Sequence, residues 1–156
     1  MLDVAISSRL FSSGFDIKTP LGIFSARKVP LSPTGEIRIL NASANPIARV
    51  ERESFFSNVY NVIITGGGFY QFVRDGNSGR TWTCKGEGKL FRVSEKSNLR
   101  FLVCEGAQEI AECSKSHFFG DYKVRVFNNA EVKLMMCVFI ALNLLEHQST
   151  SIADLF

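Results

Sequence analysis

The residues of this chain that could carry chemistry are mostly basic and are concentrated in one stretch. Between positions 80 and 100 there are six basic residues and two acidic ones, a local charge of +4, whereas the whole chain has +3. Lys and Arg side chains form charge-assisted hydrogen bonds with phosphate and carboxylate groups. This stretch is therefore a candidate anion-binding surface, although charged side chains on an exposed face often serve solvation alone.

A second short segment, 122–126, also carries basic residues. Side chains of a strand alternate between its two faces, so Lys123 and Arg125 should share one face while the apolar residues share the other. We therefore predict a shallow site for lipid headgroups or another phosphate ligand. Its predicted residues are Arg80, Lys85, Lys89, Arg92, Lys96, Lys123 and Arg125.

Cysteine and histidine suggest no catalytic or metal centre. Cys113 precedes His117 by four residues, and Cys104 is nine residues earlier. A zinc site needs four ligands, usually in two close pairs, and this is one loose pair. We predict a buried thiol and a turn histidine, hence no catalytic residue, no metal and no cofactor. A hydrolase with Cys113 as nucleophile and His117 as base is the remaining enzymatic alternative.

The triple glycine 66–68 resembles a phosphate-binding loop only superficially. No Gly-Lys-Ser/Thr follows it, and the next residues, 69–72, have the pattern of a strand. An anion site of that kind needs the N-terminus of a helix. The glycines therefore predict a hairpin turn or bulge.

The elements that would position these residues are short strands. Turn signals rich in Gly, Pro and Asn recur every 8 to 12 residues, and the segments between them are rich in Ile, Val, Phe and Tyr. This spacing is typical of an all-β sandwich or barrel. The clearest predicted strands are 36–40, 59–65, 69–74, 90–93, 101–104 and 122–127.

One segment near the C-terminus has a different character. Residues 134–145 contain no charged side chain. As a helix they would extend about 18 Å, too short for roughly 30 Å of bilayer hydrocarbon. A helix that is apolar on every face must be surrounded by protein. We therefore predict a buried helix over 132–146; membrane anchoring by this segment is the alternative.

Composition limits the class of protein. The chain has 156 residues, 46% of them hydrophobic and 21% charged, which excludes a disordered chain and suits one domain over 1–156. A charge of +3 is too small to indicate nucleic acid by itself. The N-terminus has no secretory pattern, and the four cysteines are scattered, so we expect reduced thiols and a cytoplasmic location.

An internal repeat relates residues 36–60 to residues 99–122. With an offset of 63, Ile47-Ala48 matches Ile110-Ala111, and the paired Phe55-Phe56 matches Phe118-Phe119. Each copy has the order strand, turn, strand, Phe-Phe corner, strand. We predict a duplicated unit and hence a barrel of two related halves, which would close the sheet.

Segments 35–40, 47–50, 60–64 and 122–127, with the apolar segment after residue 130, resemble the family of LURP-one-related proteins, phospholipid scramblases and tubby C-terminal domains. The resemblance implies a closed antiparallel barrel of about twelve strands around a hydrophobic C-terminal helix. It also implies phosphoinositide binding, as in tubby domains, or lipid movement, as in scramblases. The chain lacks the clustered cysteines of scramblases and a calcium-binding loop, which argues against a regulated scramblase.

From these observations we expect a non-enzymatic binding module that recognises phospholipid or phosphoinositide headgroups at a membrane surface. The location would be cytoplasmic or peripheral to a membrane, with no transmembrane span and no nucleic-acid partner. The alternative is a protein-interaction or scaffold domain that docks a partner through the Phe-Phe corners.

Overall fold

The computed structural model describes residues 2–8, 14–54, 57–75, 80–97, 99–115, 121–128 and 131–154. These residues form twelve antiparallel strands in one closed barrel and one helix, α1, which confirms the predicted fold. The strands are β1 (Leu2–Ser8), β2 (Gly14–Thr19), β3 (Gly22–Lys28), β4 (Ile37–Leu40), β5 (Pro46–Arg52), β6 (Val59–Ile64), β7 (Gly68–Arg74), β8 (Thr81–Gly86), β9 (Lys89–Ser97), β10 (Arg100–Glu105), β11 (Gln108–Lys115) and β12 (Tyr122–Val126).

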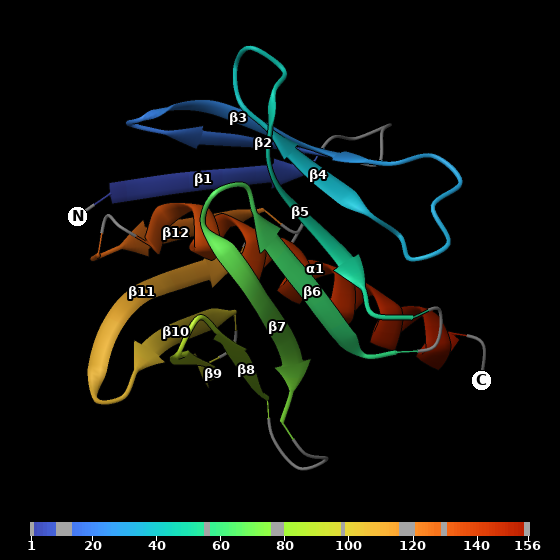
Figure 1. Cartoon of the computed structure of the whole chain (residues 1–156). Coiled ribbons are helices and arrows are strands. Elements are labelled where there is room, and N and C mark those ends of the chain that lie inside the picture. Colours follow the sequence, from blue (N-terminus) through green and yellow to red (C-terminus); the bar gives the residue numbers. More distant parts are fainter. Residues whose placement is uncertain are drawn as a thin grey trace.

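The connectivity of the barrel is simple. Every strand pairs with the next one along the chain, and β1 pairs with β12 to close the sheet (Figure 1). The closing pair is antiparallel, and its register runs from Leu2 opposite Val126 to Ile6 opposite Tyr122. Closure pairs the strands that would otherwise be exposed edges.

Alternating side chains give the barrel its two faces. In β12, Tyr122, Val124 and Val126 are buried, whereas Lys123 and Arg125 are exposed. The same period of two recurs in β4, β8 and β9, where apolar residues point inward. The inward residues of the strands pack around α1 as one continuous core.

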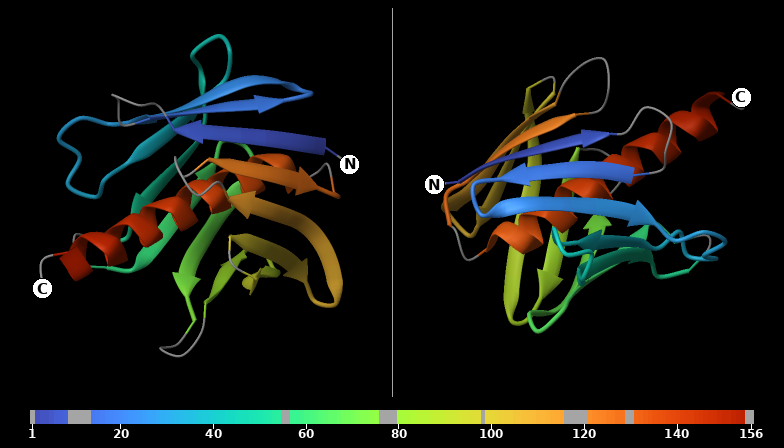
Figure 2. Two further views of the ribbon diagram at one scale, coloured as in Figure 1. Left: turned by 180° about the vertical axis from the view of Figure 1, so that it is seen from behind. Right: turned by 90° about the horizontal axis from the view of Figure 1, so that it is seen from above.

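Helix α1 (Val132–Asp154) lies inside the barrel, as Figure 2 shows from two sides. Residues 134–142 are all buried, and the ring centroid of Phe139 lies 6.0 Å from that of Tyr122. The prediction of a buried helix is therefore confirmed. Within the described residues, no helix combines the length and apolar character that a membrane crossing requires.

The helix begins at the predicted residue but is longer than predicted. It continues past residue 146 to Asp154, because residues 147–154 contain neither Gly nor Pro to end it. Figure 2 shows this C-terminal end extending beyond the strands. The apolar segment therefore predicts which part of the helix is enclosed by the barrel, but it does not predict where the helix ends.

The repeated segments coincide with β4–β6 and β10–β12, half a barrel apart. The sequence offset between corresponding inward-facing residues is not constant. It is 64 residues from β4 to β10, 63 from β5 to β11 and 62 from β6 to β12. The uniform offset of 63 thus matches the faces of the middle strands alone. A duplicated origin remains a prediction.

The triple glycine forms the turn between β6 and β7, as predicted. Gly66 and Gly68 have φ values of 72° and 108°, which an L side chain rarely adopts. The segment that follows is a strand and not a helix. The glycines therefore serve the hairpin turn.

Candidate functional site: a basic hollow on the barrel wall

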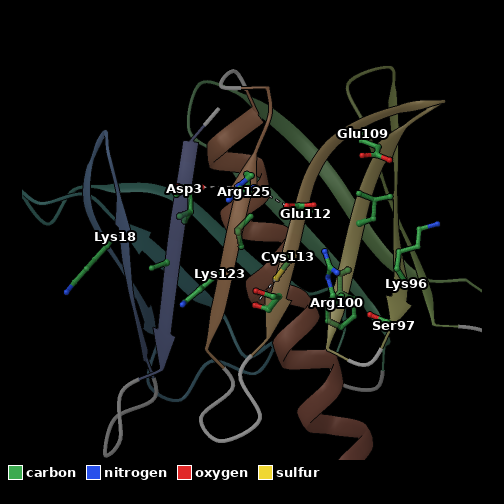
Figure 3. A pocket seen from close by; sticks show the side chains of 16 residues that line it. Asp3, Lys18, Lys96, Ser97, Arg100, Glu109, Glu112, Cys113, Lys123 and Arg125 are labelled. Atoms are coloured by element: carbon green, nitrogen blue, oxygen red, sulfur yellow. Dashed lines mark hydrogen bonds and ion pairs between the residues drawn. The ribbon is translucent and has the colours of Figure 1, made fainter.

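The outer wall of the barrel carries a hollow of about 640 Å³ that extends from β9 across β10, β11, β12 and β1 to β2 (Figure 3). Five basic residues line it, together with three acidic ones. The basic residues are Lys18, Lys96, Arg100, Lys123 and Arg125, and the acidic ones are Asp3, Glu109 and Glu112. The hollow therefore has an excess of positive charge.

Strand register explains why the wall is hollowed here. One row of directly opposed residues crosses six strands and alternates small side chains with basic ones. In order around the barrel the row is Ser97, Arg100, Ser114, Lys123, Ala5 and Lys18. The small side chains leave space between the long ones. We call these six residues the basic row.

The geometry of the basic row suits an anion. Arg100 and Lys123 lie two strands apart, which corresponds to about 10 Å between their backbones, and Ser114 stands between them. Two long cationic side chains can therefore converge above a serine hydroxyl. Lys18 stands at the edge of the hollow (Figure 3).

The neighbouring row holds one arginine and two carboxylates, a net charge of −1. Arg125 lies directly between Asp3 and Glu112, and Figure 3 shows its guanidinium between the two carboxylates. Its Nε is 3.4 Å from Asp3 Oδ1 and its Nη1 is 3.6 Å from Glu112 Oε1. Arg125 thus lines the hollow with its charge already compensated.

The other basic residues of the hollow are not compensated in this way. Lys18, Lys96, Arg100 and Lys123 form no ion pair with any residue that the structure describes. Arg100 and Lys123 are both exposed. These four side chains leave cationic donors available to a ligand.

Two bulges, one in β9 and one in β11, add curvature on either side of β10 beneath the hollow. The pairing of β10 with β9 shifts register between Arg100 and Phe101, and its pairing with β11 shifts between Val103 and Cys104. Bulges of this kind bend a strand and increase its local twist. The extra residue is Lys96 in the first shift and Ile110 in the second, so Lys96 and Ser97 are both exposed on β9, and Ile110 and Ala111 are both buried on β11.

The structure brings together three of the seven predicted site residues: Lys96, Lys123 and Arg125 all line the hollow. The other four are Arg80, Lys85, Lys89 and Arg92. Lys85 and Arg92 are exposed on β8 and β9 outside the hollow. Arg80 pairs with Glu95, and its guanidinium carbon lies 5.8 Å from the ring centroid of Trp82.

Lys89 has a structural partner at the mouth of the barrel. Its Nζ lies 2.8 Å from Oε1 of Glu131, a residue that is only 6% exposed and directly precedes α1. The hydrogen bond to Glu131, followed by the charge of that carboxylate, raises the pKa of Lys89. This ion pair ties β9 to the start of the helix.

Sequence reasoning did not assign Lys18 or Arg100 to the site. Two signals pointed to them. Apolar and polar side chains alternate within 14–19, which indicates that Lys18 faces outward, and Arg100 lies within the basic stretch 80–100. Neither signal says which strand lies beside which residue. Register across strands placed both residues in one row with Lys123, each two strands away from it.

The cysteines lie in the core or near it. Cys113 is buried, and its thiol donates to the backbone carbonyl oxygen of Ser114 at a sulfur–oxygen distance of 3.7 Å. Burial raises the pKa of Cys84 to about 12 and also raises the pKa of Cys137. Among the described residues, no three His, Cys, Asp or Glu side chains gather as metal ligands.

Two predicted features fall outside the described residues. His117, the base of the hydrolase alternative, is one of them. The Phe-Phe corners at 55–56 and 118–119, on which the scaffold alternative rests, are the other.

One solved structure has the same arrangement over most of its length. It is the X-ray structure of the protein AT5G01750 from Arabidopsis thaliana, with a TM-score of 0.63, 16% sequence identity and coverage of 91% of each chain. The chain has the tubby-like fold. The resemblance predicted from the sequence, to LURP-one-related and tubby-like proteins, is therefore confirmed at the level of the fold.

The tubby-like barrel matches no family model and no curated protein by sequence. An identity of 16% is too low to transfer an activity, because one fold hosts many functions.

Proposed function

We propose that this tubby-like barrel is a non-enzymatic binding module that recognises phospholipid headgroups at an anionic membrane surface. The basic row holds the headgroup phosphate. In this proposal Arg100 and Lys123 contact the phosphate from either side of Ser114, and Lys18 and Lys96 contribute positive potential at the rim.

The observation that carries the proposal is the composition of the basic row. Small residues separate its cations, and Arg100, Lys123 and Lys18 form no ion pair with any described residue. Arg and Lys form charge-assisted hydrogen bonds with phosphate oxygens, which are shorter and stronger than neutral ones. The hollow lies on the outer wall of the barrel, where a headgroup at a membrane surface can reach it.

The proposal narrows the predicted site. Arg125 helps to shape the hollow through Asp3 and Glu112, and Arg80 and Lys89 serve structural ion pairs. Lys85 and Arg92 lie on the wall beside the hollow and contribute long-range attraction to an anionic surface.

Vesicle co-sedimentation tests the proposal. We expect binding to phosphatidylcholine vesicles containing phosphatidylserine or a phosphatidylinositol phosphate, and little binding to phosphatidylcholine alone. A basic residue near an anionic surface contributes about 1 kcal/mol, so Arg100→Gln with Lys123→Gln should lower partitioning by roughly thirtyfold. Raising the salt concentration should weaken binding by the wild type, because salt screens exposed charges.

The matched control is the double variant Lys85→Gln with Arg92→Gln. It removes the same two charge types from exposed strand positions outside the hollow. We expect a much smaller loss of binding, because direct contacts remain. Equal loss in both double variants would mean diffuse attraction without a site, and negligible binding to all vesicles would refute the proposal.

A further inference from the structure

A second group of cations lies on a different part of the wall, outside the predicted site. Arg27 of β3 is directly opposite Arg38 of β4, and Arg38 is directly opposite Arg49 of β5. We call these three residues the arginine row. Arg38 and Arg49 each lie between two buried apolar residues of their strand, so their side chains point outward. Arg27 follows the buried Ala26 and is directly opposite Arg38, so it shares that outward face.

This register is costly without a ligand. Adjacent strands are about 4.8 Å apart, so directly opposed side chains are close neighbours. Like charges in that position destabilise a sheet. Three arginines in one row therefore need a source of negative charge.

The protein supplies one carboxylate to the three guanidiniums. Glu36, only 8% exposed, has Oε2 at 3.5 Å from Arg38 Nη2 and Oε1 at 3.5 Å from Arg49 Nη1. Both contacts are longer than the 2.7–2.9 Å typical of charge-assisted hydrogen bonds. Arg38 and Arg49 remain about half exposed, at 52% and 48%. Glu36 orients the two side chains and leaves most of their donors to solvent.

The far end of the row is kept open by a glycine. Gly14 of β2 is directly opposite Arg27, and a Cβ built there would lie 3.2 Å from Arg27 Nη1 and 2.7 Å from the carbonyl oxygen of Ala26. A larger residue would thus press on the guanidinium. Arg27 forms no ion pair with any residue that the structure describes.

The nearest other acids flank the row without completing it. Glu51, two residues along β5 from Arg49, accepts a hydrogen bond from the Thr34 hydroxyl at 3.1 Å. Asp16 of β2 lies opposite Ser25 of β3, two residues along β2 from Gly14 and on the same face. The row itself has three positive charges against the single charge of Glu36.

We propose that the arginine row is a site for a phosphate dianion. The guanidinium fork donates two parallel hydrogen bonds to adjacent phosphate oxygens, a geometry that Lys cannot reproduce. A dianion between Arg27 and Arg38, with Arg49 held by Glu36, balances the charge that the protein leaves uncompensated.

The location of the row indicates a soluble phosphate compound and not a membrane lipid. The hollow and the arginine row come nearest to each other at the adjacent strands β2 and β3, which carry Lys18 and Arg27, but their centres lie far apart. Lys123 on β12 and Arg38 on β4 are four strands apart, which is a third of the circumference of a closed barrel of twelve strands. A face turned toward a membrane through the hollow therefore leaves the arginine row turned away from it.

Isothermal titration of the full chain with inorganic phosphate and pyrophosphate, at constant ionic strength, tests the site. We expect pyrophosphate to bind the wild type, and Arg38→Gln to weaken binding by about tenfold or more, as loss of charged hydrogen bonds predicts. Arg38→Lys should also bind weakly, since it keeps the charge without the fork. Arg92→Gln, on exposed β9, is the matched control and should bind normally.

Two further readouts make the outcome decisive. Without ligand, Arg38→Gln should unfold at the same temperature as the wild type or higher, because it relieves repulsion, and this also shows that the variant folds. Its binding to anionic vesicles should be unchanged. Absence of pyrophosphate binding to the wild type, or an equal loss in Arg92→Gln, would overturn the site. A parallel loss of vesicle binding in Arg38→Gln would assign the row to the membrane and overturn the soluble ligand.

Discussion

At the scale of single residues, burial and pairing decide which side chains are available for chemistry. Lys123 and Arg125 are two residues apart on one face of β12, yet Arg125 is held by two carboxylates and Lys123 by none that the structure describes. The same contrast separates the thiols. Cys104 is partly exposed, whereas Cys84, Cys113 and Cys137 are buried.

The thiols allow a prediction at this scale. The thiolate is the reactive form, and desolvation raises the pKa of Cys84 to about 12 and raises that of Cys137. At neutral pH both groups therefore stay protonated in the folded protein. At pH 8 we therefore expect Ellman's reagent to modify Cys104 in the native protein and the other three cysteines after denaturation.

The control for this experiment is Cys104→Ser, which should show no fast-reacting thiol before denaturation. Rapid modification of a second cysteine in the native Cys104→Ser variant would contradict the burial of these side chains.

At the scale of elements, the barrel depends on α1. The strands supply one inward apolar face each, and the helix presents apolar residues on every side to fill the space that they enclose. Phe139 is fully buried at its centre and lies beside Tyr122. The helix is therefore part of the core of the sheet and not an appendage.

Substitution of Phe139 tests this role. Truncation of a buried Phe leaves a cavity, so Phe139→Ala should lower the free energy of unfolding by about 3–5 kcal/mol in urea titration. Phe139→Asp should not fold, because a lone carboxylate cannot be buried without a partner. The exposed Phe127→Ala is the control and should cost little. A soluble, cooperatively unfolding Phe139→Asp variant would rule out the central helix.

At the scale of the whole molecule, closure links the first strand to the last. β1 pairs with β12 and with β2, so the N-terminal strand completes both the barrel and the hollow. The helix packs against β5, β6 and β12, on both halves of the sheet. Because all the strands and the helix share one core, separating any of them would expose apolar side chains of the others to solvent.

This organisation predicts one cooperative unfolding transition. Trp82 reports on β8, where it packs edge-on against Phe101 with ring centroids 5.9 Å apart, and far-ultraviolet circular dichroism reports mainly on α1. Coincident denaturation curves from the two signals are expected of a single cooperative unit. A helix signal lost at lower urea concentration than Trp82 fluorescence would show that the barrel holds without α1.

Local pattern was enough to predict the ranges of six of the twelve strands (β4, β6, β7, β9, β10 and β12), the buried helix and the outward direction of Lys123 and Arg125. Their physical basis is local: side chains alternate along a strand, and an apolar segment of twelve residues must be enclosed. The resemblance added the closed barrel of about twelve strands. The structure confirmed each of these expectations.

The candidate sites were decided by tertiary structure alone. Arg27, Arg38 and Arg49 are eleven residues apart, and nothing in that spacing tells whether they face one another. Turn lengths and bulges set the register, and one residue of slip turns a side chain to the opposite face. Register likewise placed Lys123 beside Ser114 and Arg125 beside Glu112. The sequence by itself determined which charged residues face solvent. The register and closure of the sheet decided which of them are neighbours, and therefore which charges are compensated and which remain available to a ligand.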